Sequence, residues 1–160
     1  MALLIKNALV FTGENFKKSD VLIKNSKIHS LSPSISADGA DCVFDCKDKY
    51  FLIPGFVDVH VHLREPGFSY KETVKSGTMA AAKAGYTAVC TMPNLNPAPD
   101  SPENLKVQWD IIKQDAVIDV FPFGTITKGR KGVGECVDFK QRKKDVIGFS
   151  DDGTGVQTDA

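Results

Sequence analysis

Residues 54–67 run Pro-Gly-Phe-Val-Asp-Val-His-Val-His-Leu-Arg-Glu-Pro-Gly, an apolar stretch that ends in a cluster of polar side chains. The pattern predicts a buried strand followed by a loop. His60 and His62 lie two residues apart, and alternate side chains of a strand share a face, so both imidazoles should point to the same side. Arg64 continues the alternation. Histidine is the commonest metal ligand, so the pair predicts a metal site. The alternative is two buried, hydrogen-bonded histidines.

The composition is that of an ordinary globular protein. The chain has 160 residues, of which 42% are hydrophobic and 25% charged, and its formal net charge is zero. The absence of excess Lys and Arg argues against a nucleic-acid partner. No apolar run reaches the roughly 18 residues of a membrane span, so no membrane partner is expected. The N-terminus does not resemble a signal peptide, and the four cysteines form no Cys-x-x-Cys pair, which together favour a reduced, cytoplasmic protein.

The first 52 residues predict a β-rich segment. Short strands are expected over residues 3–5, 8–11, 20–25, 27–31, 43–45 and 50–53. The turn signal at 25–27 joins two of these strands into a hairpin. A unit of about fifty residues is near the lower size limit for an independent core, so we expect this segment to pack on other structure.

After Pro54-Gly55 strands and helices alternate. Strands are expected over 56–62, 87–92, 117–126 and 145–150, and helices over 70–84, over a segment that Asp100 or Ser101 caps, weakly over 133–144, and from 154 onward. This order predicts a parallel sheet with right-handed crossovers. Polar side chains follow each strand, and sites in such folds lie at the strand C-terminal ends.

The length of this second segment predicts half a barrel. A full (β/α)8 barrel takes about 250 residues, whereas 108 follow Leu52. We therefore expect an α/β fold: a partial TIM barrel of about four βα units over residues 53–160, preceded over 1–52 by part of a small composite β domain. The chain would be an N-terminal fragment of a longer enzyme. Alone it should be inactive and poorly stable, because half a barrel exposes two sheet edges.

Asp151 and Asp152 follow the fourth predicted strand. By themselves they are typical of a turn before Gly153. On the same rim as His60 and His62, however, they can supply the carboxylate that a metal site still needs. Trp109, on the second predicted helix, is expected in the core and not against a substrate.

These motifs resemble a known enzyme family. Residues 54–62 are similar to the opening of the amidohydrolase superfamily, whose first barrel strand ends in His-x-His. Residues 63–67, 71–82 and 91–94 together resemble the dihydroorotase family of the long, bacterial, metal-dependent type. The resemblance implies zinc-dependent, reversible hydrolysis of the cyclic amide of (S)-dihydroorotate to N-carbamoyl-L-aspartate in de novo pyrimidine biosynthesis. It further implies one or two Zn²⁺ ions per active site and a homo-oligomer at full length.

The resemblance also assigns the site residues. His60 and His62 match zinc ligands, and the carboxylate that bridges two zinc ions falls on Asp152, with Asp151 still open. The resemblance also implies that His62, Arg64 and Asn94 bind the small-molecule substrate, with Arg64 and Asn94 holding its carboxylate. Arg64 offers a fork suited to a substrate carboxylate. The catalytic aspartate of the family has no counterpart within this chain.

Two alternatives remain. The first is a hydantoinase-like or allantoinase-like cyclic amidohydrolase. Such relatives often carry a carboxylated lysine where this chain has Ser-Asp-Asp-Gly at residues 150–153, and Arg64 and Asn94 favour an acidic substrate. The second is a catalytically inactive, dihydroorotase-like scaffold that has lost part of its site.

Overall fold

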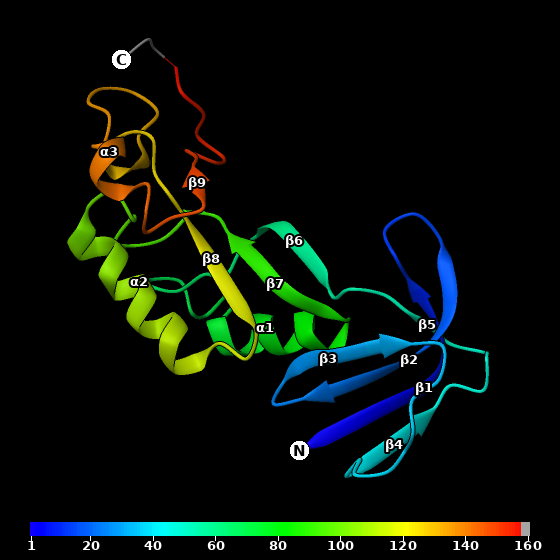
Figure 1. Cartoon of the computed structure of the whole chain (residues 1–160). Coiled ribbons are helices and arrows are strands. Elements are labelled where there is room, and N and C mark those ends of the chain that lie inside the picture. The colour runs from blue at the N-terminus through cyan, green and yellow to red at the C-terminus, as the bar shows by residue number, and fades with distance from the viewer. Residues whose placement is uncertain (158–160) are drawn as a thin grey trace. The chain divides into compact units, whose positions relative to one another are not determined.

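The structure, a computed structural model, describes residues 1–157 and divides into two compact units, Met1–Pro54 and Gly55–Ala160 (Figure 1). The first unit is a mixed sheet in the order β3-β2-β1-β4, with β5 also paired to β1. Its strands are β1 (Ala2–Phe11), β2 (Phe16–Lys24), β3 (Lys27–Ser32), β4 (Cys42–Asp45) and β5 (Phe51–Leu52). β2 is antiparallel to β1 and β3, whereas β4 and β5 run parallel to β1.

The predicted hairpin is confirmed. Asn25 and Ser26 join β2 to β3, and both have positive φ angles, 51° and 59°. A two-residue turn of this kind matches the twist of paired strands. The two short strands expected over 3–5 and 8–11 are instead one strand, β1, with a register shift between Ile5 and Ala8. The buried carboxylate of Asp20 accepts the Asn7 N–H at this irregularity, so the strand continues through it.

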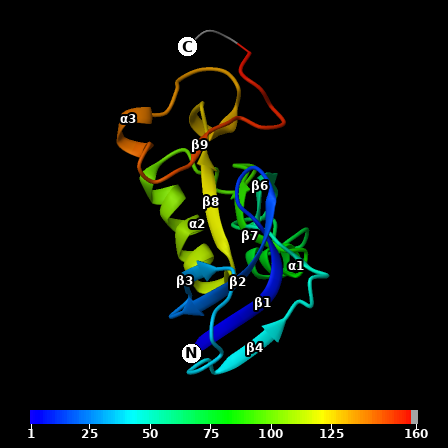
Figure 2. The ribbon, with the colours of Figure 1, turned by 45° about the vertical axis from the view of Figure 1, so that its right-hand side comes forward.

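The second unit is built on four parallel strands in the order β6-β7-β8-β9. They are β6 (Phe56–Val61), β7 (Tyr86–Thr91), β8 (Asp119–Gly124) and β9 (Gly148–Phe149). Helix α1 (Val74–Lys83) connects β6 to β7, and α2 (Pro102–Asp115) connects β7 to β8. In Figure 2 β8 lies between α2 and the β6–β7 pair. The predicted α/β class with a parallel sheet is confirmed.

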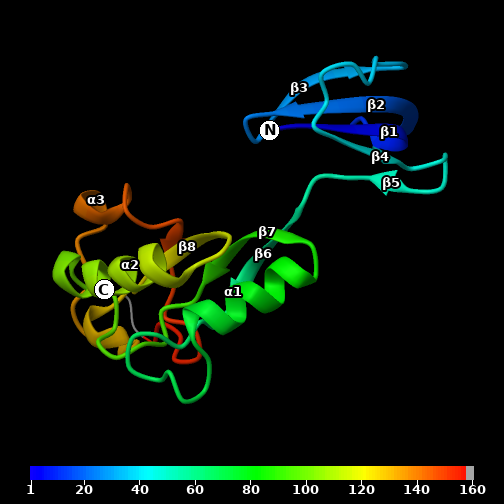
Figure 3. The same cartoon turned by 90° about the horizontal axis from the view of Figure 1, so that it is seen from below.

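The core of this unit lies between the sheet and its two helices. Leu63, Val74, Val89, Ile112 and Val120 form the buried cluster, with α1 and α2 supplying Val74 and Ile112. Figure 3 shows α1 and α2 beside the strands of this unit. Burying side chains of this size stabilises the unit by roughly 1.5–3 kcal/mol each. The packing fixes the strands, and therefore the positions at which their C-terminal ends project side chains.

The helix ends follow local capping chemistry. Ser101 accepts the Asn104 N–H and begins α2, with Pro102 in the first turn, so Ser101 and not Asp100 is the cap. The expected helix over 70–84 is shorter, because Thr73 caps α1 through a reciprocal pair of hydrogen bonds with Ser76.

Two helix predictions differ from the structure: the helix over 133–144 is much shorter than expected, and no helix begins at residue 154. The remainder of the second prediction falls on residues 158–160, which lie outside the described residues. The segment 133–144 holds only the short α3 (Phe139–Arg142), since positive-φ glycines at 132 and 134 and a bridge between Thr127 and Cys136 keep the preceding chain extended or turned. Residues 154–157 form a turn and irregular chain, because Gly155 also has positive φ. Within residues 1–157 no helix combines the length and hydropathy needed to cross a bilayer.

Candidate metal centre

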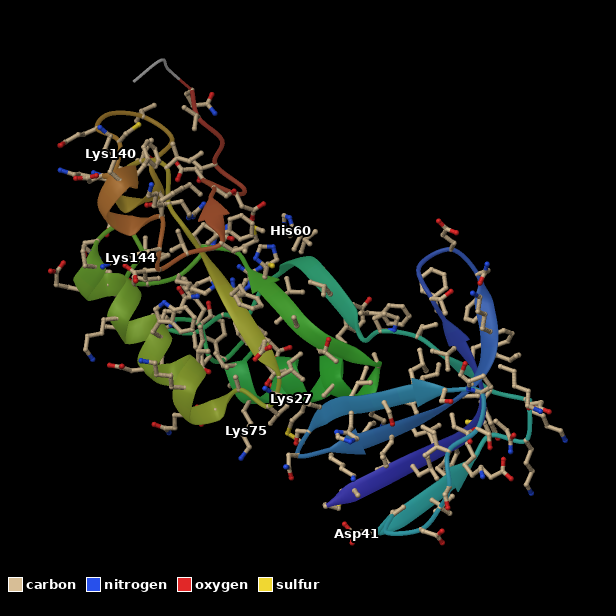
Figure 4. All side chains as sticks on the ribbon, in the orientation of Figure 1. Lys27, Asp41, His60, Lys75, Lys140 and Lys144 are labelled. Atoms are coloured by element: carbon tan, nitrogen blue, oxygen red, sulfur yellow. The ribbon has the colours of Figure 1, made fainter. Side chains whose placement is uncertain are left out.

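His60 and His62 lie close together at the C-terminal end of β6, although the strand is more exposed than predicted and its pairing with β7 shifts register between Asp58 and Val61. Figure 4 shows His60 at the end of β6 nearest to β9. The two imidazole centroids are 5.4 Å apart. His60 is more exposed than His62, and the Asp58 carboxylate accepts the backbone N–H of His60. The strand thus presents two ring nitrogens to the same space.

Asp152 completes a set of three side chains that could hold a metal ion. Its Oδ1 lies 3.5 Å from His60 Nε2, and its Oδ2 lies 3.7 Å from His62 Nε2. One ligand atom from each residue falls within 4.8 Å of the other two. These separations exceed a hydrogen bond, whereas ligands roughly 2.0–2.2 Å from one tetrahedral zinc ion stand about 3.3 Å apart. The donor set, two imidazoles and a carboxylate, therefore fits a divalent transition metal.

The carboxylate of Asp151 forms structural hydrogen bonds instead. This buried carboxylate accepts the Ile126 N–H at 2.9 Å, the Thr127 N–H at 3.1 Å and the Thr127 hydroxyl at 2.5 Å. All of these donors belong to the loop that follows β8. Asp151 is saturated by protein donors, so only Asp152 offers free oxygens toward the histidines. Of the two residues that the sequence left open, Asp152 is therefore the one whose carboxylate lies beside His60 and His62.

The surroundings of His62 favour the neutral form of its imidazole. Burial lowers the pKa of its imidazole, the positive charge of Arg64 lowers it further, and the negative charge of Asp152 acts against both. The net direction is below the ordinary value. A neutral imidazole has a free lone pair, which is the form that binds metals.

Asn94 links the end of β7 to the end of β9. Its Nδ2 donates to the main-chain oxygen of Asp152 at 2.8 Å. Its Oδ1 and the Nδ1 of His62 are both buried and form no hydrogen bond of standard geometry among the described residues. The Asn94 side chain nevertheless lies close enough to His62 to raise the pKa of that imidazole, against the larger effect of burial.

Arg64 lies in a loop whose backbone is fixed. The Glu65 carboxylate accepts the Val74 N–H at 2.8 Å and so anchors the loop to the first turn of α1. The Phe68 N–H donates to the Arg64 carbonyl at 2.9 Å. In the part of the chain that the structure describes, the Arg64 guanidinium forms no ion pair. It is a cation close enough to influence His62 and still open to a carboxylate ligand.

The sequence did not indicate one residue beside the cluster, Arg130. Its Nη1 donates to the main-chain oxygen of Asp152 and to Thr154 Oγ1, at 2.7 Å each. The only signal is the Lys-Gly-Arg-Lys-Gly run over residues 128–132, which follows β8. A basic, glycine-rich loop has many structural uses, and nothing in its spacing points to Asp152.

Other features of the unit lie away from the cluster. A hollow of about 520 Å³ on α2 is lined by Trp109, Lys113 and Lys144 among others, and includes none of the three cluster residues. Trp109 packs against the core and donates its Nε1–H to the Asp145 carbonyl, which confirms a core role. Cys90 is buried in β7, and burial raises the pKa of its thiol, so it is an unreactive core residue.

The fold is similar to that of solved hydantoinase and dihydropyrimidinase structures. The L-hydantoinase (dihydropyrimidinase) of Arthrobacter aurescens superimposes with a TM-score of 0.77 at 22% identity, covering 92% of this chain and 32% of that one. The dihydropyrimidinase of Brevibacillus agri gives a TM-score of 0.65 at 28% identity, covering 79% of this chain and 28% of that one.

Sequence comparison assigns the family. The family described as dihydro-orotase-like matches residues 49–160. The dihydroorotase of Fusobacterium nucleatum is 47% identical over 98% of this chain, and that of Staphylococcus aureus is 44% identical over 97%. The chain therefore belongs to the dihydro-orotase-like family. It spans about 36% of the length of these curated relatives.

Proposed function

We propose that the full-length protein containing this chain is a dihydroorotase, which hydrolyses the ring amide of (S)-dihydroorotate reversibly to N-carbamoyl-L-aspartate. The observation that carries the proposal is the convergence of His60, His62 and Asp152 at the strand ends, in a chain of this family. Its place would be de novo pyrimidine biosynthesis in the cytoplasm. We also propose that the full-length protein forms a homo-oligomer.

We further propose that the four parallel strands are part of a (β/α)8 barrel. On β6, Val57 and Val59 are 57% and 67% exposed, and among the described residues one edge of this strand is unpaired. Exposed valines on a strand with an open edge favour additional structure packed over it. In a complete barrel the missing ligands and the catalytic aspartate would come from later strand ends on the same rim.

His60, His62 and Asp152 would hold Zn²⁺. When bound, zinc would lower the pKa of a coordinated water toward neutrality and polarise the amide carbonyl. His62 contributes a ring that stays neutral because its pKa is lowered. Whether one or two ions bind would depend on ligands from the rest of the barrel, with Asp152 as the shared carboxylate.

Arg64 and Asn94 would bind and orient the substrate. The Arg64 guanidinium carries no ion pair within residues 1–157, and its planar fork matches the geometry of a carboxylate. The Oδ1 of Asn94 is buried and has no hydrogen-bond partner of standard geometry among the described residues. Fixing the carboxylate of dihydroorotate would place its ring amide against the three ligands and lower the entropy cost of reaction.

The second candidate is a hydantoinase-like activity, which the fold of the solved relatives favours. Against it stands the carboxylate ligand: the segment after β9 supplies Asp152, and Asp151 is buried in structural hydrogen bonds. A neutral cyclic amide would also leave the charge of Arg64 without a partner. The acidic substrate is therefore the better match.

The test is a substrate panel on the full-length protein. We expect ring opening of (S)-dihydroorotate, ring closure of N-carbamoyl-L-aspartate, and little turnover of hydantoin or allantoin. Activity should vanish on treatment with a chelator and return with Zn²⁺. Preferred turnover of hydantoin would establish the second candidate, and no turnover of any cyclic amide by a zinc-loaded protein would leave the inactive scaffold as the correct interpretation.

A further inference from the structure

We propose that Arg130 is a positioning residue that aims the Asp152 carboxylate at His60 and His62. This inference rests on the proposed function, because Arg130 would orient a ligand of the proposed metal site. No hydrogen bond or ion pair joins Arg130 to the Asp152 carboxylate or to the two imidazoles among the described residues. Arg130 acts through the main-chain oxygen of Asp152.

The main-chain oxygen of Asp152 accepts two side-chain donors from two different loops. Arg130 Nη1 approaches from the loop after β8 at 2.7 Å, and Asn94 Nδ2 approaches from the loop after β7 at 2.8 Å. The hydrogen bond from Arg130 is charge-assisted, so it is the stronger type. The same Nη1 also donates to Thr154 Oγ1 at 2.7 Å, which ties down the chain on the far side of Gly153.

The remaining contacts of Asp152 lock its backbone. Ser150 Oγ accepts the Asp152 N–H at 3.1 Å, and the buried Asp151 carboxylate fixes the preceding residue. With both its N–H and its C=O held, residue 152 has little backbone freedom. The direction of its side chain then follows from a single χ1 rotamer choice, and the carboxylate stays between the two imidazoles.

The loop that carries Arg130 is built to present it. Asp100 Oδ2 accepts the Gly129 N–H at 2.7 Å, and Thr127 accepts the Gly132 N–H at 2.9 Å while donating to Asp151. Arg130 itself has a φ of 55°, a left-handed conformation that costs a residue with a Cβ roughly 1–2 kcal/mol. A strained, half-buried arginine held from both sides indicates that the position of its guanidinium matters.

The experiment replaces Arg130 without disturbing this backbone. Arg130→Asn removes the guanidinium, and asparagine tolerates a left-handed conformation better than most residues. The matched control is Lys131→Asn, which makes the same charge change at the adjacent, exposed position. Both variants are made in the full-length protein. Zn²⁺ affinity is measured by competition with a chromophoric chelator, and the absorption spectrum of the Co²⁺-loaded protein reports the ligand geometry.

We expect Arg130→Asn to weaken Zn²⁺ binding roughly 10- to 100-fold, as loss of a group that orients a ligand typically does. Its Co²⁺ spectrum should change, whereas Lys131→Asn should match the wild type in both measurements. Arg130→Lys, which keeps the charge and can make one of the two bonds, should recover part of the affinity. Equal affinities and identical spectra for Arg130→Asn and Lys131→Asn would overturn the proposal.

A metal-free measurement separates this inference from the proposed function. Thr154 and Gly155 donate their N–H groups to the Asp151 carbonyl, at 2.9 Å each, within the segment that Arg130 holds. In the apo protein, Arg130→Asn should speed hydrogen exchange at these two amides, and Lys131→Asn should not. If the wild type bound no metal, the proposed function would fail while this readout still tested Arg130. If Arg130→Asn did not fold, Arg130→Lys would decide by the same two measurements, and unchanged exchange and affinity would refute the role.

Discussion

The end of β6 and the end of β9 supply the same cluster in different ways. At β6, the end of the strand brings His60 and His62 together, through a register shift between Asp58 and Val61 and a hydrogen bond from the His60 N–H to the Asp58 carboxylate. At β9, a two-residue strand gives way at once to a turn, where Asp151 and Asp152 are adjacent, chemically identical, and placed in opposite environments. One is 3% exposed and bonded to the β8 loop, and the other faces the histidines.

This difference shows what a regular element contributes to a site. In a strand, the backbone restricts the side on which each residue lies, so His60 and His62 converge with only one local side-chain contact, the hydrogen bond from the His60 N–H to Asp58. In a turn, neighbouring carboxylates take whichever direction their hydrogen bonds impose. The site at β9 therefore depends on Asn94, Arg130 and Asp151, each of which constrains the chain around Asp152.

The largest effect should come from the β6 side. We expect His60→Ala combined with His62→Ala to remove zinc from the full-length protein, because two of the three described ligands are lost together. Elemental analysis after dialysis measures this directly. His29→Ala is the matched control, since His29 is exposed on β3. A double variant that retained the zinc content of the control would show that the ligands lie elsewhere.

Some features of the fold and the site were predictable from the sequence, and others were not. Periodicity is a local property of the sequence. It made three features predictable: the nearness of His60 and His62, the order of strands and helices, and the gathering of polar side chains at the C-terminal ends of the strands. The helix over 133–144 was wrongly predicted because glycines 132 and 134 adopt positive φ, which the composition of the segment did not reveal. The contact between Arg130 and Asp152 joins residues 22 positions apart and depends on tertiary structure alone.

The next effect separates the two aspartates. Asp151→Asn should lower the free energy of unfolding by about 3 kcal/mol, because an amide nitrogen would then face the Ile126 and Thr127 N–H groups that now have an acceptor. Asp152→Asn should change stability in chelator by less than about 1 kcal/mol but weaken zinc binding. Urea unfolding and chelator competition measure the two quantities. If both variants lost the same stability, the division of tasks between the two residues would be wrong.

A smaller effect is expected at Arg64. Arg64→Lys should raise KM for dihydroorotate about tenfold, equivalent to about 1.4 kcal/mol, because lysine cannot pair with a carboxylate through two bonds. The zinc content should not change. Lys71→Arg, the reverse exchange in the same loop, serves as the control. Kinetics identical to the wild type would remove Arg64 from the substrate site.

The smallest effect concerns protonation at the end of β6. In the metal-free protein the pKa of His62 is lowered from its ordinary value of 6.5, mainly by burial and next by the charge of Arg64. The unfolded chain therefore binds a proton at His62 more readily than the folded chain does. The stability linked to His62 is complete above the ordinary pKa, declines as pH falls through it, and stops declining below the folded-state pKa.

Arg64→Gln should narrow this pH window. Removing the cation raises the pKa of His62, while burial still holds it below the ordinary value. NMR titration of the imidazole C–H signals in the apo protein measures the shift, with Lys71→Gln as a control of equal charge change in the same loop. A pKa that moved equally in both variants would mean that the net charge of the loop, and not the placement of Arg64 beside β6, sets the protonation of His62. An unchanged pKa in Arg64→Gln would show that burial, with the smaller effect of the His60 charge, lowers the pKa of His62 without a contribution from Arg64.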